Sequence, residues 1–266
     1  MSGIHSVVIG GTRGTGRAVV RSLAQEGHTV SAVGRRAPEK QDADIPSVSH
    51  WSTDLLDEAQ TSETWNEIVQ KQGPLHNLVF CQQYRGAGNR WKGELETSLS
   101  ATKNAIESLA PHFAEDSQGS ITVISSASGR FITEEQPVGY HVVKAGLDQM
   151  VRYYAVTLGP EGIRVNCISS GAVVKEESRE FWQSGDGPGE LFASISPLGR
   201  MVTSQDIANA VVFLSSTNAS FITGHNLLVD GGISLQWQQS LALKLSQISD
   251  TEITQRPNAG LDKVKK

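Results

Sequence analysis

The sequence predicts an α/β protein: a single-domain, doubly wound (Rossmann) parallel sheet of about seven strands with helices on both faces. Three observations predict this fold. Short runs of Val, Ile and Leu alternate with longer segments of helical period, as in repeated βαβ units. The strand runs are apolar at nearly every position, which is typical of strands covered on both faces. A glycine-rich turn joins the first strand to the first helix.

Each predicted strand is a short aliphatic or β-branched run bounded by polar or turn residues. In chain order the strands are HSVVI at 5–9, TVSAV at 29–33, VSHWS at 48–52, HNLVFC at 76–81, SITVIS at 120–125, IRVNCI at 163–168 and NLLV at 226–229. The intervals carry apolar residues at helical spacing, which predicts helices at 14–26, 57–71, 96–114, 139–158 and 204–216.

Two segments depart from this alternation. Residues 174–200 are too many for a plain connection, and their aromatic side chains favour a lid or binding loop over a disordered insertion. Beyond residue 233, Leu241, Leu245 and Ile248 share one helical face, so we expect a docked helix followed by a frayed terminus. We therefore predict a catalytic domain at 1–240 and a C-terminal extension at 241–266.

Composition and charge exclude several classes of protein. The 266 residues contain 23 Lys plus Arg and 28 Asp plus Glu, with no basic run outside the last few positions, which disfavours a nucleic-acid partner.

The N-terminus has no secretory pattern and no apolar stretch is long enough to span a membrane, so we expect a cytoplasmic protein. Cys81 and Cys167 form neither a CxxC pair nor part of a disulfide framework. We therefore expect both to be small buried apolar residues of a protein in a reducing compartment. The seven histidines have no metal-ligand spacing, so no metal is expected.

The turn after the first strand reads Gly10-Gly11-Thr12-Arg13-Gly14-Thr15-Gly16-Arg17. Backbone amides at the start of the following helix would face a ligand phosphate there. As a GxxxxGK[ST] phosphate loop the string fails, because Arg17 and Ala18 replace the lysine and the hydroxyl. As GxxxGxG it fits without substitution through Gly10, Gly14 and Gly16. The turn therefore predicts a dinucleotide site, with a purely structural turn as the alternative.

The second strand ends Val33-Gly34-Arg35-Arg36 and carries no carboxylate. A free ribose 2′-hydroxyl requires an acidic residue at this place, whereas a 2′-phosphate requires arginine. Arg13, Arg35 and Arg36 can converge on such a phosphate, which favours NADP(H) over NAD(H). The alternative is a solvated basic turn.

Tyr140 and Lys144 are four residues apart in a predicted helix, so their side chains share one face. An ammonium group beside a phenol lowers the phenol's pKa, which brings a tyrosine closer to proton transfer near neutral pH. Ser126 follows the fifth strand, at the edge of the sheet where open α/β proteins bind ligands. The three residues and the glycine turn can therefore face one crevice.

With these motifs the chain resembles the classical short-chain dehydrogenase/reductase family, in particular its 3-oxoacyl-carrier-protein reductase-like branch, over about residues 4–232. The matching motifs are GGTRGTG, TDL at 53–55, ISSASG, YHVVK, GIRVNCISSG, PLGR at 197–200 and FITGHNLLVDGG.

The resemblance implies that Tyr140 is the general acid of ketone reduction, that Lys144 binds the nicotinamide ribose and that Ser126 binds the substrate carbonyl. It implies that Asp54 and Leu55 meet the adenine. The full set of cofactor-binding residues that it implies is Gly10, Thr12, Arg13, Gly14, Thr15, Gly16, Arg35, Arg36, Asp54, Leu55, Tyr140, Lys144, Gly171 and Val173.

The chain departs from the family pattern around the expected cofactor. Phe80-Cys81-Gln82-Gln83 stands where the family has NNAG. The family's active-site asparagine falls at Ser98, which we keep among the catalytic residues because a serine can also hold a water molecule. The Pro-Gly after the sixth strand is Ser170-Gly171, and a family threonine falls at Lys175.

Residues Arg85, Arg90, Trp91 and Lys92 follow the fourth strand and suit either an anionic, carrier-bound substrate or a solvated loop. The leading hypothesis is an enzyme that uses NADP(H) to reduce a ketone or 3-oxoacyl-type carbonyl, or to oxidise the alcohol. The family departures favour an alternative, a nucleotide-sensing protein with little or no turnover. The resemblance also implies a homo-oligomer, a dimer or a tetramer built through the helices near 96–114 and 139–158.

Overall fold

The structure is a computed structural model in which residues 3–115, 119–184 and 187–252 are described. The chain divides into two compact units. The first contains the residues up to 179 together with 202–229, and the second contains 180–201 and the residues from 230 onward. The boundary that the sequence places at residue 240 stays a prediction.

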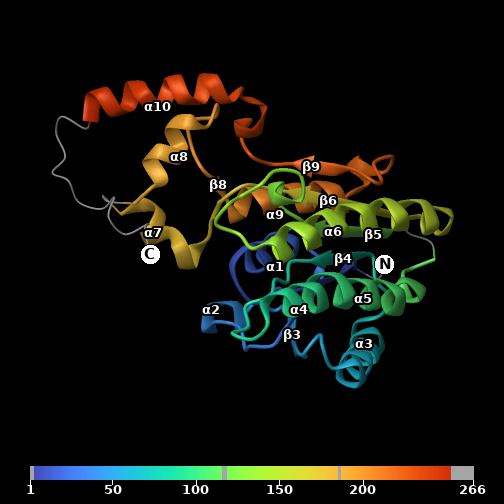
Figure 1. The fold of residues 1–266 in the computed structure, drawn as a ribbon. Helices are drawn as coiled ribbons and strands as arrows, with labels where there is room; N and C mark the ends of the chain where they lie inside the picture. Colours follow the sequence, from blue (N-terminus) through green and yellow to red (C-terminus); the bar gives the residue numbers. More distant parts are fainter. Residues whose placement is uncertain (1–2, 116–118, 185–186, 253–266) are drawn as a thin grey trace. The chain divides into compact units, whose positions relative to one another are not determined.

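The first unit is built on a parallel sheet with the strand order β3-β2-β1-β4-β5-β6-β9 (Figure 1). The strands are β1 His5–Ile9, β2 Thr29–Gly34, β3 Val48–Ser52, β4 Asn77–Phe80, β5 Gly119–Ile124, β6 Ile163–Ser169 and β9 Asn226–Leu228. The predicted doubly wound sheet is confirmed, and every predicted strand is present with ends that differ by at most one residue.

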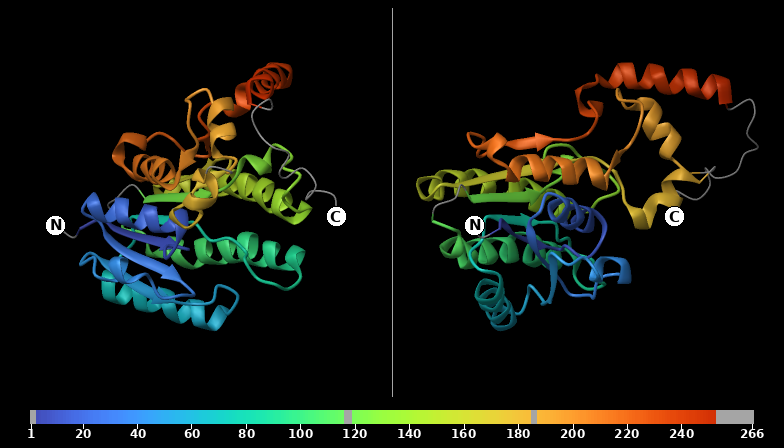
Figure 2. Two further views of the ribbon diagram at one scale, coloured as in Figure 1. Left: turned by 90° about the vertical axis from the view of Figure 1, so that its left-hand side faces the viewer. Right: turned by 180° about the vertical axis from the view of Figure 1, so that it is seen from behind.

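Helices cover both faces of this sheet, as the views of Figure 2 show. The α-helices of the first unit are α1 Gly14–Gln25, α2 Lys40–Ala43, α3 Glu58–Gln72, α4 Arg90–Glu94, α5 Ala101–Leu109, α6 Val138–Thr157 and α9 Ser204–Ser215. Side chains of α1 and α9 pack on one face, and side chains of α3, α5 and α6 pack on the other.

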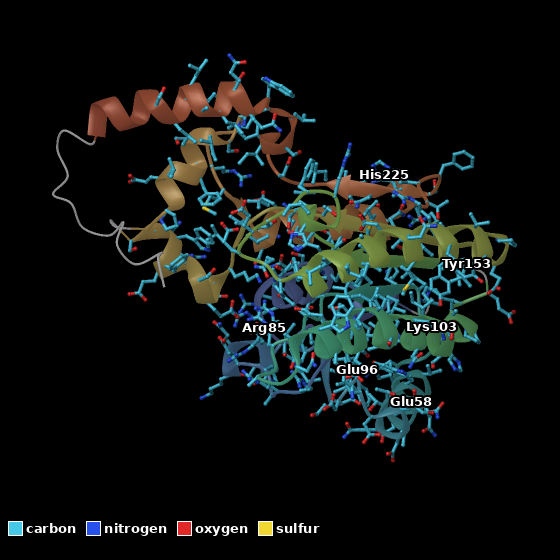
Figure 3. All side chains as sticks on the ribbon, viewed as in Figure 1. Glu58, Arg85, Glu96, Lys103, Tyr153 and His225 are labelled. Carbon is cyan, nitrogen blue, oxygen red and sulfur yellow. The ribbon has the colours of Figure 1, made fainter. Side chains whose placement is uncertain are left out.

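Strand β1 shows how both faces of the sheet are buried. Val7 and Ile9 join the core beneath α3, α5 and α6, while Val8 joins the core beneath α1 and α9. Because successive side chains of a strand point to opposite faces, a strand buried on both sides must be apolar throughout. Polar residues such as Glu58 and Lys103 remain on the outer faces of the helices (Figure 3).

The helix predicted at 96–114 differs from the observed one at both ends. It begins at Arg90, where the Asn89 side chain accepts a hydrogen bond from Lys92 N at 3.0 Å, and it ends at Leu109 before the turn that contains Pro111. Between α4 and α5 the chain makes a π-helical turn, η1 Leu95–Ser100. The start was missed because the basic residues from Arg90 hide the helical period.

Short elements complete the chain. Two strands, β7 Val173–Val174 and β8 Val202–Thr203, pair in parallel apart from the main sheet. The 3₁₀ turns are η2 Ala110–His112, η3 Ala127–Gly129, η4 Gly159–Glu161, η5 Glu176–Ser178, η6 Thr217–Ala219 and η7 Ile233–Leu235.

In its described residues the second unit contains the α-helices α7 Arg179–Gln183, which begins one residue before the unit, α8 Gly189–Ile195 and α10 Gln238–Glu252. The segment after residue 174 therefore carries secondary structure, with Trp182 stacked edge-on between Phe181 and Phe192. The predicted C-terminal helix is confirmed as α10, which contacts α8. Leu241 is half-buried and Leu245 exposed, while the side chain of Ile248 and the predicted frayed end lie outside the described residues. No helix of the described residues is long and apolar enough to cross a membrane.

Candidate active site

The candidate site lies where adjacent parallel strands end. Strands β1 and β4 pair directly, as do β4 and β5 and then β5 and β6, so their carboxyl ends meet at one edge of the sheet. The loops after these ends are tied together, since Ser125 N donates to Ile168 O at 2.8 Å and Ala127 N donates to Ser170 O at 3.0 Å. The strand order reverses between β1 and β4, which is the place where open α/β sheets bind their ligands.

The glycine turn after β1 is packed too closely for side chains at two positions. Gly10 has φ +79°, and a Cβ built on it would lie 2.6 Å from Gln82 N. A Cβ built on Gly16 would lie 2.0 Å from Gly10 O. Because backbone atoms block both positions, only glycine allows the turn to fold against the start of α1. Gly10 N also donates to Val33 O at 2.8 Å, which joins the turn to β2.

The start of α1 already holds an anionic group of the protein itself. Gly14 N donates to Glu177 Oε1 at 3.0 Å, and Arg17 Nη2 donates to the same oxygen at 3.0 Å. Burial opposes ionisation of Glu177, but backbone amides, including that of Gly14, and the charge of Arg17 prevail and lower its pKa. The carboxylate therefore occupies a helix start that favours anions.

A buried arginine holds this arrangement in place. The Arg17 side chain is 3% exposed, and its Nη1 lies 2.6 Å from Glu39 Oε1 while its Nη2 lies 2.9 Å from Glu176 Oε2. Arg21 Nε donates to Asp42 Oδ1 at 2.5 Å. These pairs fasten α2 and the turn after β7 to the outside of α1, so Glu177 is held at the end of the glycine turn.

The three arginines predicted to meet a 2′-phosphate are exposed. Arg13 is the residue before α1, and Arg35 and Arg36 follow β2. None of them makes an ion pair with any residue in the described part of the chain. Thr12, whose hydroxyl lies against Gly34, and Thr15 are half-buried beside them.

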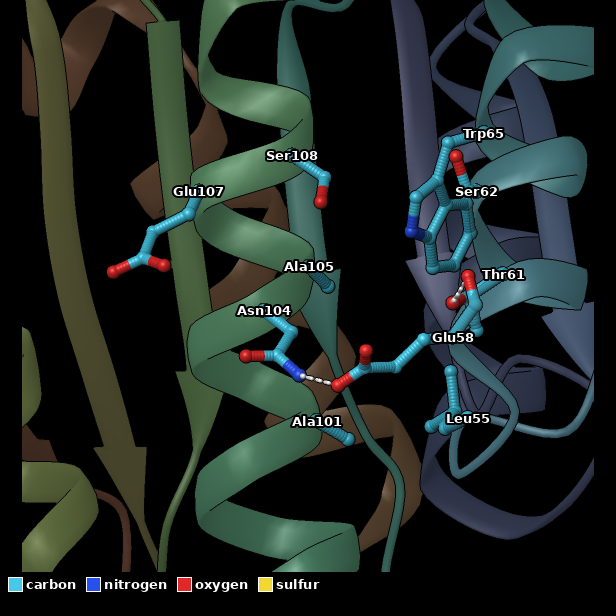
Figure 4. Close-up of a pocket in the computed structure, with 10 residues that line it drawn as sticks. All are labelled: Leu55, Glu58, Thr61, Ser62, Trp65, Ala101, Asn104, Ala105, Glu107 and Ser108. Atoms are coloured by element: carbon cyan, nitrogen blue, oxygen red, sulfur yellow. Dashed lines mark hydrogen bonds between the residues drawn. The ribbon is translucent and has the colours of Figure 1, made fainter.

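The two residues predicted to meet the adenine follow β3. Asp54 Oδ1 accepts a hydrogen bond from Leu56 N at 3.1 Å, and Leu55 packs against the core. Leu55 also lines a pocket of about 250 Å³ between α3 and α5 (Figure 4). The pocket's other lining residues are Glu58, Thr61, Ser62, Trp65, Ala101, Asn104, Ala105, Glu107 and Ser108, so none of the predicted catalytic residues borders it.

Ser126 and Tyr140 come together after β5. Ser126 is extended, with φ −159° and ψ 152°, and its Oγ accepts a hydrogen bond from Ser128 N at 3.2 Å. Tyr140 is half-buried in the first turn of α6. Burial raises the pKa of its phenol, an interaction with the Ser126 hydroxyl lowers it, and the charge of Glu94 raises it further, so the net shift is upward.

Lys144 lies one turn along α6 and is 5% exposed. Its Nζ donates to Ile124 O at 2.9 Å and lies 5.5 Å from the centroid of the Tyr140 ring. Burial lowers the pKa of Lys144 to about 8, although Glu94 and Asp148 oppose the shift. At the phenol, burial and Glu94 outweigh the Ser126 interaction, and the lowering of the Tyr140 pKa by Lys144 that the family resemblance implies stays a prediction.

The family departures are all near this edge of the sheet. Ser98 is buried in η1, its carbonyl accepts from Thr102 Oγ1 at 2.7 Å, and Gln82 Nε2 donates to that same hydroxyl at 2.8 Å. Gly171 is exposed after β6. Lys175 follows β7, which begins at Val173, and the Lys175 side chain lies 3.2 Å from a Cβ built on Gly14. Burial, with Arg85 nearby, lowers the pKa of Lys175.

The cysteines, histidines and surface cations add no further reactive group here. Burial raises the pKa of the Cys81 thiol to about 12, and Cys167 is buried. Within the described ranges no group of three or more His, Cys, Asp or Glu that could hold a metal ion is found. Arg90, Trp91 and Lys92 form the exposed first turn of α4 rather than a loop.

Sequence reasoning missed two acidic residues of the site. Glu94 is 1% exposed and influences both Tyr140 and Lys144. Its position is in phase with the buried Ser98, Ala101 and Ala105, and this spacing was the signal that a helix starting at residue 96 concealed. No local pattern announces Glu177, because its contact with Gly14 joins residues 163 positions apart.

A glycine turn at the switch point of a doubly wound sheet, with a Ser, Tyr and Lys cluster beside it, defines a dinucleotide-binding α/β protein. The family model described as enoyl-(acyl carrier protein) reductase matches residues 10–234. The isoepoxydon dehydrogenase patN of Penicillium expansum is 30% identical over 261 residues, covering 90% of this chain and 97% of that protein.

Two further comparisons agree. The 3-oxoacyl-[acyl-carrier-protein] reductase FabG of Staphylococcus aureus is 28% identical over 242 residues, covering 86% of this chain and 97% of that protein. The structure of a short-chain type dehydrogenase/reductase from Mycobacterium ulcerans matches with a TM-score of 0.76 and 26% identity, covering 88% of this chain and 90% of that one. The chain belongs to the short-chain dehydrogenase/reductase family of nicotinamide-dependent oxidoreductases.

The closeness of Gly16 to Gly10 can be tested with alanine. In Gly16→Ala the new methyl would meet Gly10 O, so the turn must shift, and we expect a loss of about 1–3 kcal/mol of stability together with weakened dinucleotide binding. Gly159→Ala is the matched control, because nothing lies within 4 Å of its built Cβ and its φ is not left-handed. Thermal unfolding and fluorescence titration with NADPH measure both effects. Equal behaviour of the two variants would contradict the packing argument.

The contact between Glu177 and Gly14 N predicts competition with a bound phosphate. Glu177→Gln removes the charge with little change of shape, so we expect dinucleotide affinity to rise about two- to fivefold. Calorimetric titration with NADPH measures this, and Glu180→Gln, a charge change on the following helix, serves as control. Weaker binding by the Glu177 variant would mean that the carboxylate supports the ligand instead of competing with it.

Proposed function

We propose that the protein is an NADP(H)-dependent oxidoreductase that reduces a ketone or 3-oxoacyl-type carbonyl to an alcohol, or catalyses the reverse reaction. The observation that carries the proposal is the meeting of Ser126, Tyr140 and Lys144 after β5, next to the glycine turn after β1. The names of the relatives FabG and patN support a reaction between a carbonyl and an alcohol.

The residues present fit a dinucleotide. Gly10, Gly14 and Gly16 put no side chain between the turn and a ligand, and the start of α1 already attracts the carboxylate of Glu177. Gly10, Thr12, Gly14, Thr15 and Gly16 would hold the pyrophosphate end, and Asp54 and Leu55 the adenine. Gly171 and Val173 would lie near the nicotinamide, which supplies the hydride when bound.

The three exposed arginines support NADP(H) as the cofactor. Arg13, Arg35 and Arg36 have no ion-pair partner in the described residues, and no carboxylate ends β2. Three exposed arginines without ion-pair partners cost little free energy in water, and their guanidinium groups remain available to bind a dianionic group. A 2′-phosphate is the group that distinguishes the two nicotinamide dinucleotides at this place.

The proposed catalytic roles of Ser126, Tyr140 and Lys144 follow from which of their groups can donate or hold a proton. The Ser126 hydroxyl would hydrogen-bond the substrate carbonyl oxygen and hold it beside the Tyr140 phenol. Tyr140 would donate its proton to that oxygen as negative charge develops there. Lys144, buried one turn away, would bind the cofactor ribose and favour the return of a proton to Tyr140. Ser98 would hold a water molecule behind Lys144.

A nucleotide-binding protein with little turnover is the second candidate. Two observations favour it: Lys144 Nζ donates to Ile124 O, and burial raises the Tyr140 pKa. A phenol with a raised pKa donates its proton less readily, although it remains fully protonated at neutral pH. Reduction needs the protonated form, so the first candidate accommodates both observations.

We also propose a homo-oligomer. The outer face of α6 exposes Val138, Val142, Tyr153 and Val156, an apolar stripe that a second copy could cover. The substrate is a small molecule, which the proposal allows to be carrier-bound. The cytoplasmic location stays a prediction.

Tyr140→Phe tests the catalytic proposal. Without the phenol the proton step is lost, so we expect turnover to fall by about 10²- to 10⁴-fold while NADPH still binds. NADPH oxidation against a panel of ketones and quinones measures this. Tyr153→Phe, an exposed tyrosine on the same helix, is the control and should keep full activity. Turnover indifferent to Tyr140→Phe, or tight NADPH binding by the wild-type protein with no turnover of any substrate, would refute the proposal.

Arg35→Asp tests the choice of cofactor. Losing a charge-assisted contact and adding a carboxylate should weaken NADPH binding by about 10- to 100-fold, with NADH binding unchanged or improved. Titration with both dinucleotides gives the ratio. Lys71→Asp makes the same charge change on α3 and should affect neither. An equal loss for both dinucleotides would show that Arg35 does not read the 2′-phosphate.

A further inference from the structure

A buried carboxylate lies behind the Tyr140 and Lys144 pair. Glu94 is on the inner side of α4 and is 1% exposed. The α4 helix packs against α6, and the Glu94 Cβ lies 3.8 Å from a Cβ built on Gly139, the residue before Tyr140. The side chain is therefore lodged beside the first turn of α6, away from water.

This carboxylate lacks the partners that a buried charge normally has. Neither Glu94 oxygen accepts a short hydrogen bond from the described residues, and both oxygens are shielded from water. Arg90 Nε is 4.0 Å from Oε1, but the Arg90 side chain is 56% exposed, so solvent screens that pair. An unpaired buried carboxylate is costly, which makes its electrostatic neighbours important.

The groups around the cluster can be named for each element packed against it. Glu94 interacts electrostatically with Arg90 of its own helix and with Ser98 of η1, and it acts on Tyr140 and Lys144 of α6. Tyr84 packs on the adjacent Gly93. Besides Glu94, the groups that act on Lys144 are Asp148, Cys81 and Lys175. Asp148 is already engaged, because it accepts from Ser125 Oγ and from Asn226 Nδ2, each at 2.7 Å. By contrast, Glu94 has only the 4.0 Å approach of Arg90 Nε and a favourable interaction with Ser98.

The charges act on one another in a consistent direction. Burial raises the pKa of Glu94, while Arg90, Lys144 and Ser98 favour its charged form. Burial lowers the pKa of Lys144, and Glu94 opposes that shift. After burial and the contact with Ser126, Glu94 also raises the pKa of Tyr140. An ionised Glu94 therefore favours an ammonium at Lys144 and a neutral phenol at Tyr140.

We propose that Glu94 is a positioning residue that keeps Lys144 as the ammonium and Tyr140 as the phenol up to higher pH, and so extends the pH range in which the site can deliver a proton, that is, carry out carbonyl reduction. The inference rests on the proposed function of Tyr140 and Lys144 and adds that Glu94 extends the pH range of the reduction direction of that reaction. In reduction the Tyr140 O–H bond breaks as the new O–H bond forms on the substrate oxygen. The reverse reaction requires the phenolate, which a nearby carboxylate disfavours.

A direct test reads the ionisation of Tyr140 without any turnover. The chain has four tyrosines, so ¹³Cζ-labelled tyrosine gives few signals, and Tyr140→Phe identifies the one that matters. In Glu94→Gln we expect the midpoint of the Tyr140 titration to fall by about one pH unit, a tenfold larger ionisation constant. Glu94→Asp keeps the charge and should stay close to the wild-type protein. Glu96→Gln, two residues along the chain on η1 and half-exposed, should change nothing.

The pH profiles of the two reaction directions give the second readout. When Glu94 is replaced by Gln, Tyr140 and Lys144 lose their protons at lower pH. The alkaline limb of the reduction profile should therefore move to lower pH by about one unit, and the rise of the oxidation profile should move the same way. A purely structural role would lower the rate constant without shifting either profile. Glu94→Asp should restore the wild-type profile.

Stability does not obscure the test. If Glu94→Gln fails to fold, Glu94→Leu removes the same charge without leaving a buried amide unpaired, and we expect it to unfold at a higher temperature than the wild-type protein. The inference is overturned if neither charge-removing variant shifts the Tyr140 titration. Absence of NADPH oxidation in the wild-type protein would defeat the proposed function alone, because the tyrosine titration still reports on Glu94.

Discussion

The parallel pairing of β4 with β1 on one side and β5 on the other is the constraint on which the site depends. Parallel strands send all their carboxyl ends to one edge, so residues from three distant parts of the chain meet there without any long-range recognition of their own. Gly10, Gln82 and Ser126 follow β1, β4 and β5 respectively. The sheet can hold this register only because both of its faces are covered, which the two core clusters around α1 with α9 and around α3, α5 and α6 provide.

The fold was predictable because its signals are local. A strand buried on both faces must be apolar at nearly every position, and a helix on such a sheet must repeat its apolar residues at helical spacing. Both patterns can be recognised in the sequence of β1 and α6. The meeting of Ser126 with Tyr140 was predictable for the same reason, since one follows a strand and the other begins the next helix. The direction of the Tyr140 pKa was not, because burial is a property of the assembled site.

The residues that sequence reasoning missed share a physical cause. Glu94 sits at a position whose helical phase is apolar, and Glu177 meets an amide far away in the chain. The charge of Glu177 is explained by a partner that no local window contains, whereas Glu94 also has the local partners Arg90 and Ser98. Composition and periodicity therefore predict the strands and helices that carry the site. Which charged side chains meet there depends on the folded structure.

Those charges compensate one another in two places. Near Gly14, the change from a family threonine to Lys175 adds a cation, and Glu177 on the same turn adds an anion, so the charge of the phosphate end is nearly preserved. Behind Tyr140, a family asparagine has become the neutral Ser98, and Glu94 brings a negative charge to a cluster in which Lys144 would otherwise lose its proton more readily. In both places a charged residue of this chain lies beside a departure from the family pattern. Burial of Glu94 is costly, because an apolar side chain in its place would cost no desolvation, so its charge is the property of this position that the structure leaves to be explained.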